Sequence, residues 1–181
     1  MKVIPVSEVE IKHTVISLEF KNSAGYDGIS NKILKRFKNC INKPLTYICN
    51  FSLTTGIFLE RYKFAVAWPI YKKGEKTAIS HYKPISLLIA LSKILKIILF
   101  KRLDQHLESN NSLAAEQFGF RKVVSTESAI FILTDNMLTS LNQRHQTRGV
   151  FFNLTKVFDC VNHDTILNKL HYYVIRGICH Y

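Results

Sequence analysis

GVFFNLTKVFDCVNHDTI, residues 149–166, is the stretch that decides the fold class of this 181-residue chain. Its first six residues form a nearly continuous apolar run bounded by turn signals, which predicts a strand buried on both faces. The polar residues after it predict a tight turn, and HDTILNKLHYY (163–173) predicts a short helix. Asn153 stands at the end of the predicted strand, where a metal site would need a carboxylate. The stretch is therefore either a functional strand without its acid or a plain piece of core.

Outside this stretch, the sequence predicts more helices than strands. Ser7 and Glu10 form a capping-box pattern that starts a helix ending near Phe20. Apolar residues recur at helical spacing from Ile29 to Ile41, and a further helix is predicted from Pro44 to Gly56. FAVAWPIY (64–71) predicts a strand, residues 86–107 a long helix, and Ser125 the N-cap of another helix. This mixture predicts a helix-rich α+β fold.

The chain carries a net charge of +12, and most of it lies in one region. Ten Lys and Arg residues and one acidic residue lie between Arg61 and Arg102, so nine of the twelve net charges are found there. A concentrated positive field favours a polyanionic partner, nucleic acid first and an anionic membrane second. A solvated basic surface is the alternative.

The cysteines and the apolar segments narrow the class of protein. The four cysteines lack the close spacing of a zinc site and are too few for a disulfide scaffold, which predicts free thiols and an intracellular protein, in nucleus or cytoplasm. The most apolar run (85–100) is shorter than the roughly 20 residues of a bilayer span and is interrupted by two lysines. It predicts a buried helix and no membrane insertion.

Five stretches, the last of which contains the opening one, occur in a characteristic order. They are WPIYKKGEKT (68–77), HYKPISLL (81–88), LSKILKIILFKRL (91–103), EQFGFRKVVSTESAI (116–130) and GVFFNLTKVFDCVNHDTILNKL (149–170). Their order and spacing resemble the reverse transcriptase domain of non-LTR retrotransposons of the jockey type. SAGYDGISNKILK (23–35) resembles the entry to the fingers of the same family.

The resemblance implies a partial right-hand polymerase fold, consisting of the fingers and the first strand of the palm. It divides the chain into a helical lead-in (1–22), a fingers-like region (23–148) and the start of a palm (149–181). The family's paired aspartates belong to a later palm motif, and this sequence contains no Asp-Asp pair. The implied partners are an RNA template, a DNA primer and deoxynucleoside triphosphates.

The resemblance also implies Mg²⁺, and it places the metal-binding Asp of the family at Asn153. The backbone carbonyl of Leu154 would be a further ligand by the same analogy. Mg²⁺ prefers charged oxygen ligands, and an amide retains a carbonyl acceptor but has no negative charge. We therefore expect metal affinity and turnover to be lower by orders of magnitude. Asp159, six residues further on, is expected to cap or brace the loop.

Nucleotide-binding residues follow from the same resemblance. Phe158 corresponds to the aromatic residue under the nucleotide sugar, with a core Phe as the alternative. Cations that would hold the triphosphate are Lys72, Lys73, Lys83 and Arg121, with solvated surface cations as the alternative. Lys83 stands where the family usually has Arg, which would retain the charge and lose the bidentate geometry.

Other departures from the family pattern point to a decayed copy. Tyr26 replaces a usual Pro, Val157 replaces Ala, and Val174 stands where Gly is usual. If that position has a positive φ, a β-branched residue is strained there. We consider three hypotheses: an inactive reverse transcriptase fragment, a non-catalytic basic nucleic-acid-binding remnant, and a membrane-associated helical protein.

Overall fold

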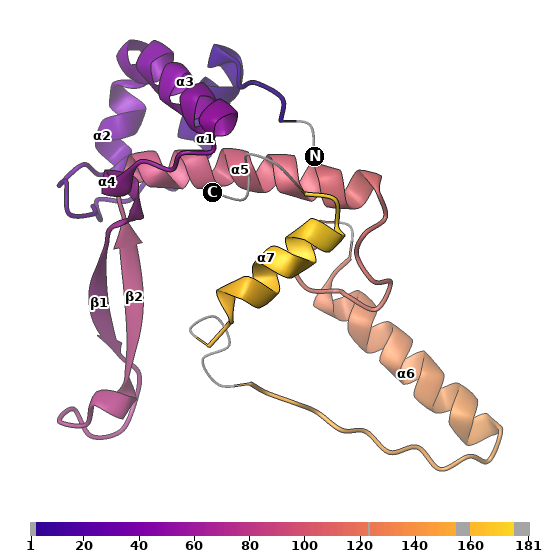
Figure 1. Cartoon of the computed structure of the whole chain (residues 1–181). Helices are drawn as coiled ribbons and strands as arrows, with labels where there is room; N and C mark the ends of the chain where they lie inside the picture. The colour runs from indigo at the N-terminus through magenta and orange to yellow at the C-terminus, as the bar shows by residue number, and fades with distance from the viewer. Residues whose placement is uncertain (1–2, 123, 155–159, 176–181) are drawn as a thin grey trace. The chain divides into compact units, whose positions relative to one another are not determined.

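The computed structural model describes residues 3–122, 124–154 and 160–175, which form helices and one small sheet (Figure 1). The chain makes two compact units. The first unit comprises residues 1–106 and 174–181, and the second unit comprises residues 107–173. The mixture of helices with a two-stranded sheet confirms the predicted α+β class.

The helices of the first unit follow one another before and after the sheet. They are α1 (Glu8–Ser17), α2 (Asn31–Arg36), α3 (Lys38–Thr55), α4 (Glu60–Lys63) and α5 (Ala90–Ser109), whose last turn belongs to the second unit. The Ser7 side chain accepts a hydrogen bond from the Glu10 amide, which confirms the predicted N-cap of α1. Gly56 ends α3 with a φ of 73°, also as predicted.

Two predicted helix boundaries in this unit are wrong. Residues 29–41 are not one helix, because α2 ends at Arg36 and α3 begins at Lys38. The start predicted at Pro44 is also wrong, because Pro44 lies inside α3. The apolar contacts that α3 makes with the rest of the unit outweigh the backbone hydrogen bond that a proline cannot donate.

One hydrophobic cluster holds the first unit together. Side chains from α1, α2, α3 and α5 meet in it, and all its fully buried members lie between Val6 and Ile98. Ile11, Ile94 and Ile98 are completely inaccessible to solvent. In the described part of the chain, we find no helix whose length and hydropathy would let it span a bilayer.

Two polar contacts attach the N-terminal residues to this core. The Asn50 side chain pairs with the Val6 backbone, accepting from its N–H at 2.7 Å and donating to its carbonyl at 3.0 Å. Arg102 on α5 donates to both carboxylate oxygens of Glu10, at 2.9 and 2.7 Å, and to the carbonyl of Ile4. Helix α1 is therefore fixed to α3 and α5 by directional bonds as well as by apolar contact.

The sheet is an antiparallel hairpin of β1 (Ala65–Tyr71) and β2 (Tyr82–Leu88) (Figure 1). β1 confirms the predicted strand, and both strands are edges because the sheet has only two. The long helix predicted from Ser86 begins at Ala90 instead, because Ser86–Leu88 belong to β2. Those three residues pair with Ala65–Ala67, a contact that local helical spacing does not reveal.

The second unit contains α6 (Thr126–Asn142) and α7 (His163–Tyr172). Ser125 caps α6 as predicted, in a reciprocal capping box with Ser128. No side chain is buried among the described residues of this unit. The strand predicted for residues 149–154 is wrong in this structure. These residues make no ladder of backbone hydrogen bonds with any described strand, and a β-strand requires such a neighbour.

Candidate functional site

Asn153 lies on an extended segment whose side chains point into solvent. Its neighbours Phe151 and Phe152 are 82% and 86% exposed, and Asn153 and Leu154 are also exposed. Phe158 and Asp159 fall outside the described residues. The segment thus presents one uncharged amide and one backbone carbonyl at the positions implied as metal ligands.

These donors do not fit a pair of divalent cations. Across residues 3–122, 124–154 and 160–175, no group of three or more His, Cys, Asp or Glu side chains is placed to hold a metal ion. Mg²⁺ takes carboxylates and phosphates in preference to neutral amides. The described residues at this position therefore supply no charged oxygen ligand for Mg²⁺.

The lysines predicted to bind triphosphate gather at the β1–β2 hairpin. Lys72 and Lys73 follow β1 in the tip loop (residues 72–81), Lys83 lies on β2, and all three side chains are exposed. Lys76 of the same loop is also exposed and lies over the Tyr71 ring, with its Nζ 5.9 Å from the ring centroid. The structure therefore places these cations on one element.

The tip loop is held by its own hydrogen bonds. The Tyr71 hydroxyl donates to the carbonyl of Gly74, and the Tyr82 hydroxyl donates to the carbonyl of Lys76 at 2.9 Å. His81 Nδ1 is 2.8 Å from the carbonyl of Glu75. Gly74 has a φ of 98°, and a Cβ there would lie 2.6 Å from the His81 ring. The loop is an ordered carrier for its lysines and depends on glycine at this position.

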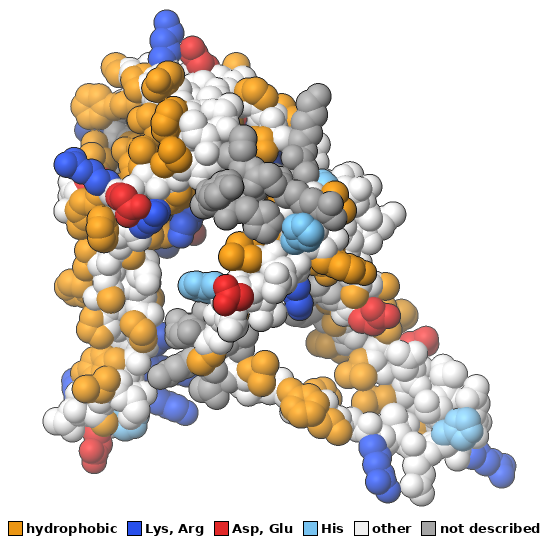
Figure 2. Space-filling model, viewed as in Figure 1, with side chains coloured by type: hydrophobic (Ala, Val, Ile, Leu, Met, Phe, Trp, Pro, Cys, Tyr) orange, Lys and Arg blue, Asp and Glu red, His pale blue; other side chains and the backbone are white. Residues whose placement is uncertain are grey.

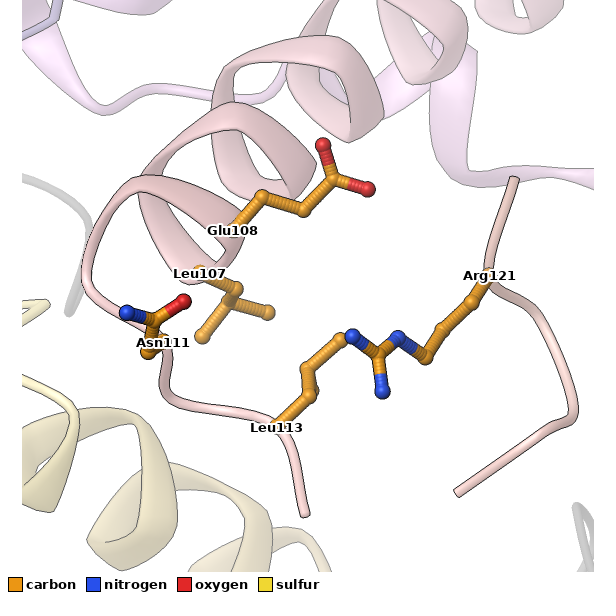
Figure 3. A pocket seen from close by; sticks show the side chains of 5 residues that line it. All are labelled: Leu107, Glu108, Asn111, Leu113 and Arg121. Atoms are coloured by element: carbon orange, nitrogen blue, oxygen red, sulfur yellow. The ribbon is translucent and has the colours of Figure 1, made fainter. Parts of the chain in front are cut away.

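Arg121 lies in the second unit. Its guanidinium donates to the carbonyl of Ala114 at 3.2 Å and lines a pocket of about 200 Å³. The other lining residues are Leu107, Glu108, Asn111 and Leu113 (Figure 3). Because Glu108 adds a carboxylate, the pocket carries both signs of charge, and Arg121 is the cation among its lining residues.

The positive charge of the chain is divided unequally between the units. The first unit holds 19 Lys and Arg and seven Asp and Glu, and therefore accounts for the whole net charge of +12. The second unit holds six of each sign and is neutral. A polyanion is therefore attracted to the first unit.

The cysteines confirm the predicted free thiols. Cys40, Cys49 and Cys160 are unpaired with one another, and Cys179 lies outside the described residues. Burial raises the pKa of the Cys49 thiol to about 11, and the nearby Glu10 charge adds to the rise. Cys49 therefore stays protonated at neutral pH and serves as a small apolar core residue.

Two features of the hairpin and its surroundings were missed by the sequence analysis. The exposed Trp68 lies on β1, and the alternation Val66, Trp68, Ile70 is the signal that places these side chains on one face. The pair of Glu10 and Arg102 joins positions 92 residues apart, and no local pattern reveals it.

Comparisons with known proteins bear on the identity of the chain. The sequence profile described as "Reverse transcriptase (RNA-dependent DNA polymerase)" matches residues 70–180. A probable RNA-directed DNA polymerase from transposon BS of Drosophila melanogaster is 31% identical over 167 residues, which is 92% of this chain and 18% of that protein.

Two further Drosophila melanogaster relatives belong to mobile elements. The RNA-directed DNA polymerase from mobile element jockey is 28% identical over 92% of this chain and 19% of its own length. The probable polymerase from transposon X-element is 24% identical over 90% of this chain and 18% of its own length. This chain spans about a fifth of the length of these relatives. It belongs to the reverse transcriptase (RNA-dependent DNA polymerase) family.

Proposed function

We propose that the chain forms the fingers and the start of the palm of a mobile-element RNA-directed DNA polymerase, and that it does not synthesise DNA by itself. The family match and the order of the five stretches support this proposal. The proposal includes a partial right-hand polymerase fold. It also includes the division of the chain into a lead-in (1–22), a fingers-like region (23–148) and the start of a palm (149–181). Its partners would be an RNA template, a DNA primer and deoxynucleoside triphosphates, in an intracellular compartment.

The proposed lack of DNA synthesis rests on the metal-ligand atoms available at Asn153. The side chain is a neutral amide, and the described residues bring no cluster of acids together. The sequence also has no adjacent pair of aspartates to supply the second half of a two-metal site. In this proposal Lys72, Lys73, Lys83 and Arg121 contact the triphosphate, Phe158 lies under the sugar, and Leu154 offers its carbonyl.

Primer extension tests the proposal directly. The 181-residue chain, an RNA template with an annealed DNA primer, and Mg²⁺ should give no extended product, while an active reverse transcriptase in the same buffer should extend it. Asn153→Asp should also give none, because one restored carboxylate leaves the paired acids missing. Extension by either chain would contradict the proposed inactivity.

A second candidate function is non-catalytic binding of nucleic acid by the first unit. The observation that favours it is the charge of this unit, which holds the entire net charge of the chain. If Lys72, Lys73, Lys76 and Lys83 each contact one phosphate, the logarithm of affinity for a single strand should fall with the logarithm of salt at a slope of about −3. A slope near zero, or no binding at low salt, would contradict this function.

A further inference from the structure

Trp68 is the single tryptophan of the chain, and it is 60% exposed on the β1–β2 hairpin. Side chains directly opposite each other in an antiparallel pair lie on the same face. The register pairs Val66 with Leu87, Trp68 with Ile85, and Ile70 with Lys83. These six side chains form one surface, which we call the Trp68 face.

The two faces of the hairpin differ in size and chemistry. On the opposite face, Ala65, Ala67 and Pro69 pair with Leu88, Ser86 and Pro84, and the two large rings of Tyr71 and Tyr82 pair at the tip end. Val66, Trp68, Ile70 and Ile85 are all exposed, and Figure 2 shows hydrophobic side chains along the hairpin. Contiguous exposed apolar surface on a two-stranded hairpin marks a place where something binds.

The charges around the Trp68 face determine what kind of partner fits it. Lys83 lies on the face itself, two residues or about 7 Å along the strand from the Trp68 pair. The tip loop adds Lys72, Lys73 and Lys76, and Glu75 is the single acidic residue between Glu60 and Asp104. A partner must therefore combine a flat apolar surface with repeated negative charge.

We propose that the Trp68 face is a stacking platform for the bases of single-stranded nucleic acid, with Lys83 and the tip-loop lysines holding the phosphates. Unpaired bases offer π-faces for an exposed aromatic ring, whereas bases inside a duplex do not. Ile70 and Ile85 flank the indole and cover the edges of a stacked base. The inference rests on the proposed nucleic-acid binding and assigns its contact surface.

The hydrogen bonds within the tip loop support the assignment of the Trp68 face as a stacking platform. Hydrogen bonds from Tyr71 and Tyr82 to backbone carbonyls fix the loop before any ligand arrives. The lysines are therefore carried by a rigid element, and less backbone entropy is lost on binding. An anionic bilayer or an apolar polypeptide would be the other occupants of such a face, and the experiment separates them.

Intrinsic fluorescence of the full chain tests the proposal, because all tryptophan emission comes from Trp68. Titration with a short oligouridylate should quench the emission, since a stacked base lies against the indole. An abasic oligomer of equal length should still bind, as measured by anisotropy of an attached dye, but without quenching. A free nucleoside triphosphate should quench far less at equal base concentration.

Substitutions at Trp68 provide a second test of the proposal. Trp68→Ala should weaken oligouridylate binding about 5- to 150-fold, and Trp68→Phe should retain most of the affinity. Ile79→Ala is the matched control, because Ile79 is 90% exposed in the tip loop but lies outside the Trp68 face. It should leave affinity unchanged. Circular dichroism should show equal helix content in all three variants.

The outcomes separate this inference from the proposed function. If oligouridylate and the abasic oligomer bind equally tightly without quenching, nucleic-acid binding stands and the stacking platform is overturned. If no oligomer binds at low salt, both are overturned. Tighter binding to phosphatidylserine vesicles with a blue shift of the emission would identify a bilayer as the occupant. Protection of the free chain's Trp68 from acrylamide would show that polypeptide covers the face.

Discussion

Val174 adopts a backbone conformation that suits glycine better than a β-branched residue. Its φ is 62°, and it directly follows Tyr173, the C-cap of α7. Helices commonly end in a left-handed residue at this position, and that residue is usually glycine. A β-branched residue with a positive φ is strained, and Val174 meets this condition. Strain of this kind costs about 1–3 kcal/mol.

Val174→Gly is expected to stabilise the folded chain by about 1 kcal/mol, because glycine removes the steric conflict, while the greater entropy of its unfolded chain offsets part of that gain. Urea unfolding followed by circular dichroism measures the change. Val174→Ala retains a Cβ at positive φ and should gain less. Equal or lower stability of the glycine variant would show that the strain is relieved by other contacts.

The Glu10 carboxylate and the Arg102 guanidinium form a well-shielded ion pair in the first unit, with side chains 24% and 11% exposed. Arg102→Ala removes two hydrogen bonds to this carboxylate and one to the Ile4 carbonyl. We expect a loss of about 2–3 kcal/mol in the free energy of unfolding at neutral pH. Urea denaturation measures it, and Lys96→Ala on the exposed side of α5 is the control.

This pair also predicts a dependence on pH. The hydrogen bond from Arg102 is the largest cause that lowers the pKa of Glu10 below its ordinary value of 4.5. A carboxyl with a lowered pKa contributes stability above its ordinary pKa and loses it as the pH falls through the folded-state value. Below pH 4.5, wild-type stability should therefore fall more steeply than that of Glu10→Gln. Parallel pH curves would mean that the pair contributes nothing.

At the scale of elements, the hairpin depends on Gly74. A positive φ and the nearness of the His81 ring both disfavour a side chain at this position. Gly74→Ala should disorder the tip loop at a cost of about 1 kcal/mol or more, because either the backbone or the imidazole must move. Amide exchange of residues 72–81 should become faster than in wild type. Unchanged exchange would show that the loop accommodates a Cβ.

A matched substitution separates the effect of Gly74 from a general effect of loop mutation. Gly119 lies in a loop of the second unit, and a Cβ there meets no atom within 4 Å. Gly119→Ala should leave the exchange rates of residues 72–81 unchanged.

The sequence predicted elements whose signals are local. The caps at Ser7 and Ser125, the end of α3 at Gly56 and the strand β1 all follow from a few neighbouring residues. β2 was missed because Ser86–Leu88 fits both a helix and a strand, and its pairing with Ala65–Ala67 decides between them. The run at residues 149–154 has the composition of a buried strand but has no described strand beside it.

The candidate site was predictable in part. The lysines of the hairpin were named from motif order, and the structure places them on one element. The pocket that joins Arg121 to Glu108 was not foreseen, because it depends on how the loop after α5 turns. Phe158 stays a prediction, since it lies outside the described residues.

At the scale of the whole molecule, the buried side chains belong to the first unit, as the net positive charge does. The hydrophobic cluster lies within the first unit, whereas the second unit has no buried side chain in its described portion. Exposed apolar residues of α6 include Ile130, Phe131 and Leu141. A helix without a buried face has little tertiary support.

We expect residues 1–109, which end with helix α5, to unfold cooperatively on their own and residues 110–173 to lack a cooperative transition. Calorimetry of the full chain should give an unfolding enthalpy of about 75 kcal/mol near 60 °C, the value for about 109 folded residues, instead of about 130 for the whole chain. The isolated segment 1–109 should match the full chain in transition temperature. An enthalpy near the larger value would contradict this division.

The position of the core along the chain also has a consequence during synthesis. Every member of the hydrophobic cluster precedes Ser109, the last residue of α5. A ribosome that has released this helix has already delivered every member of this cluster, although Val174 and Ile175 of the first unit follow later. Domains generally fold as they emerge. The basic hairpin should therefore be in place on the nascent chain, and available to nearby RNA, while the second unit is still being translated.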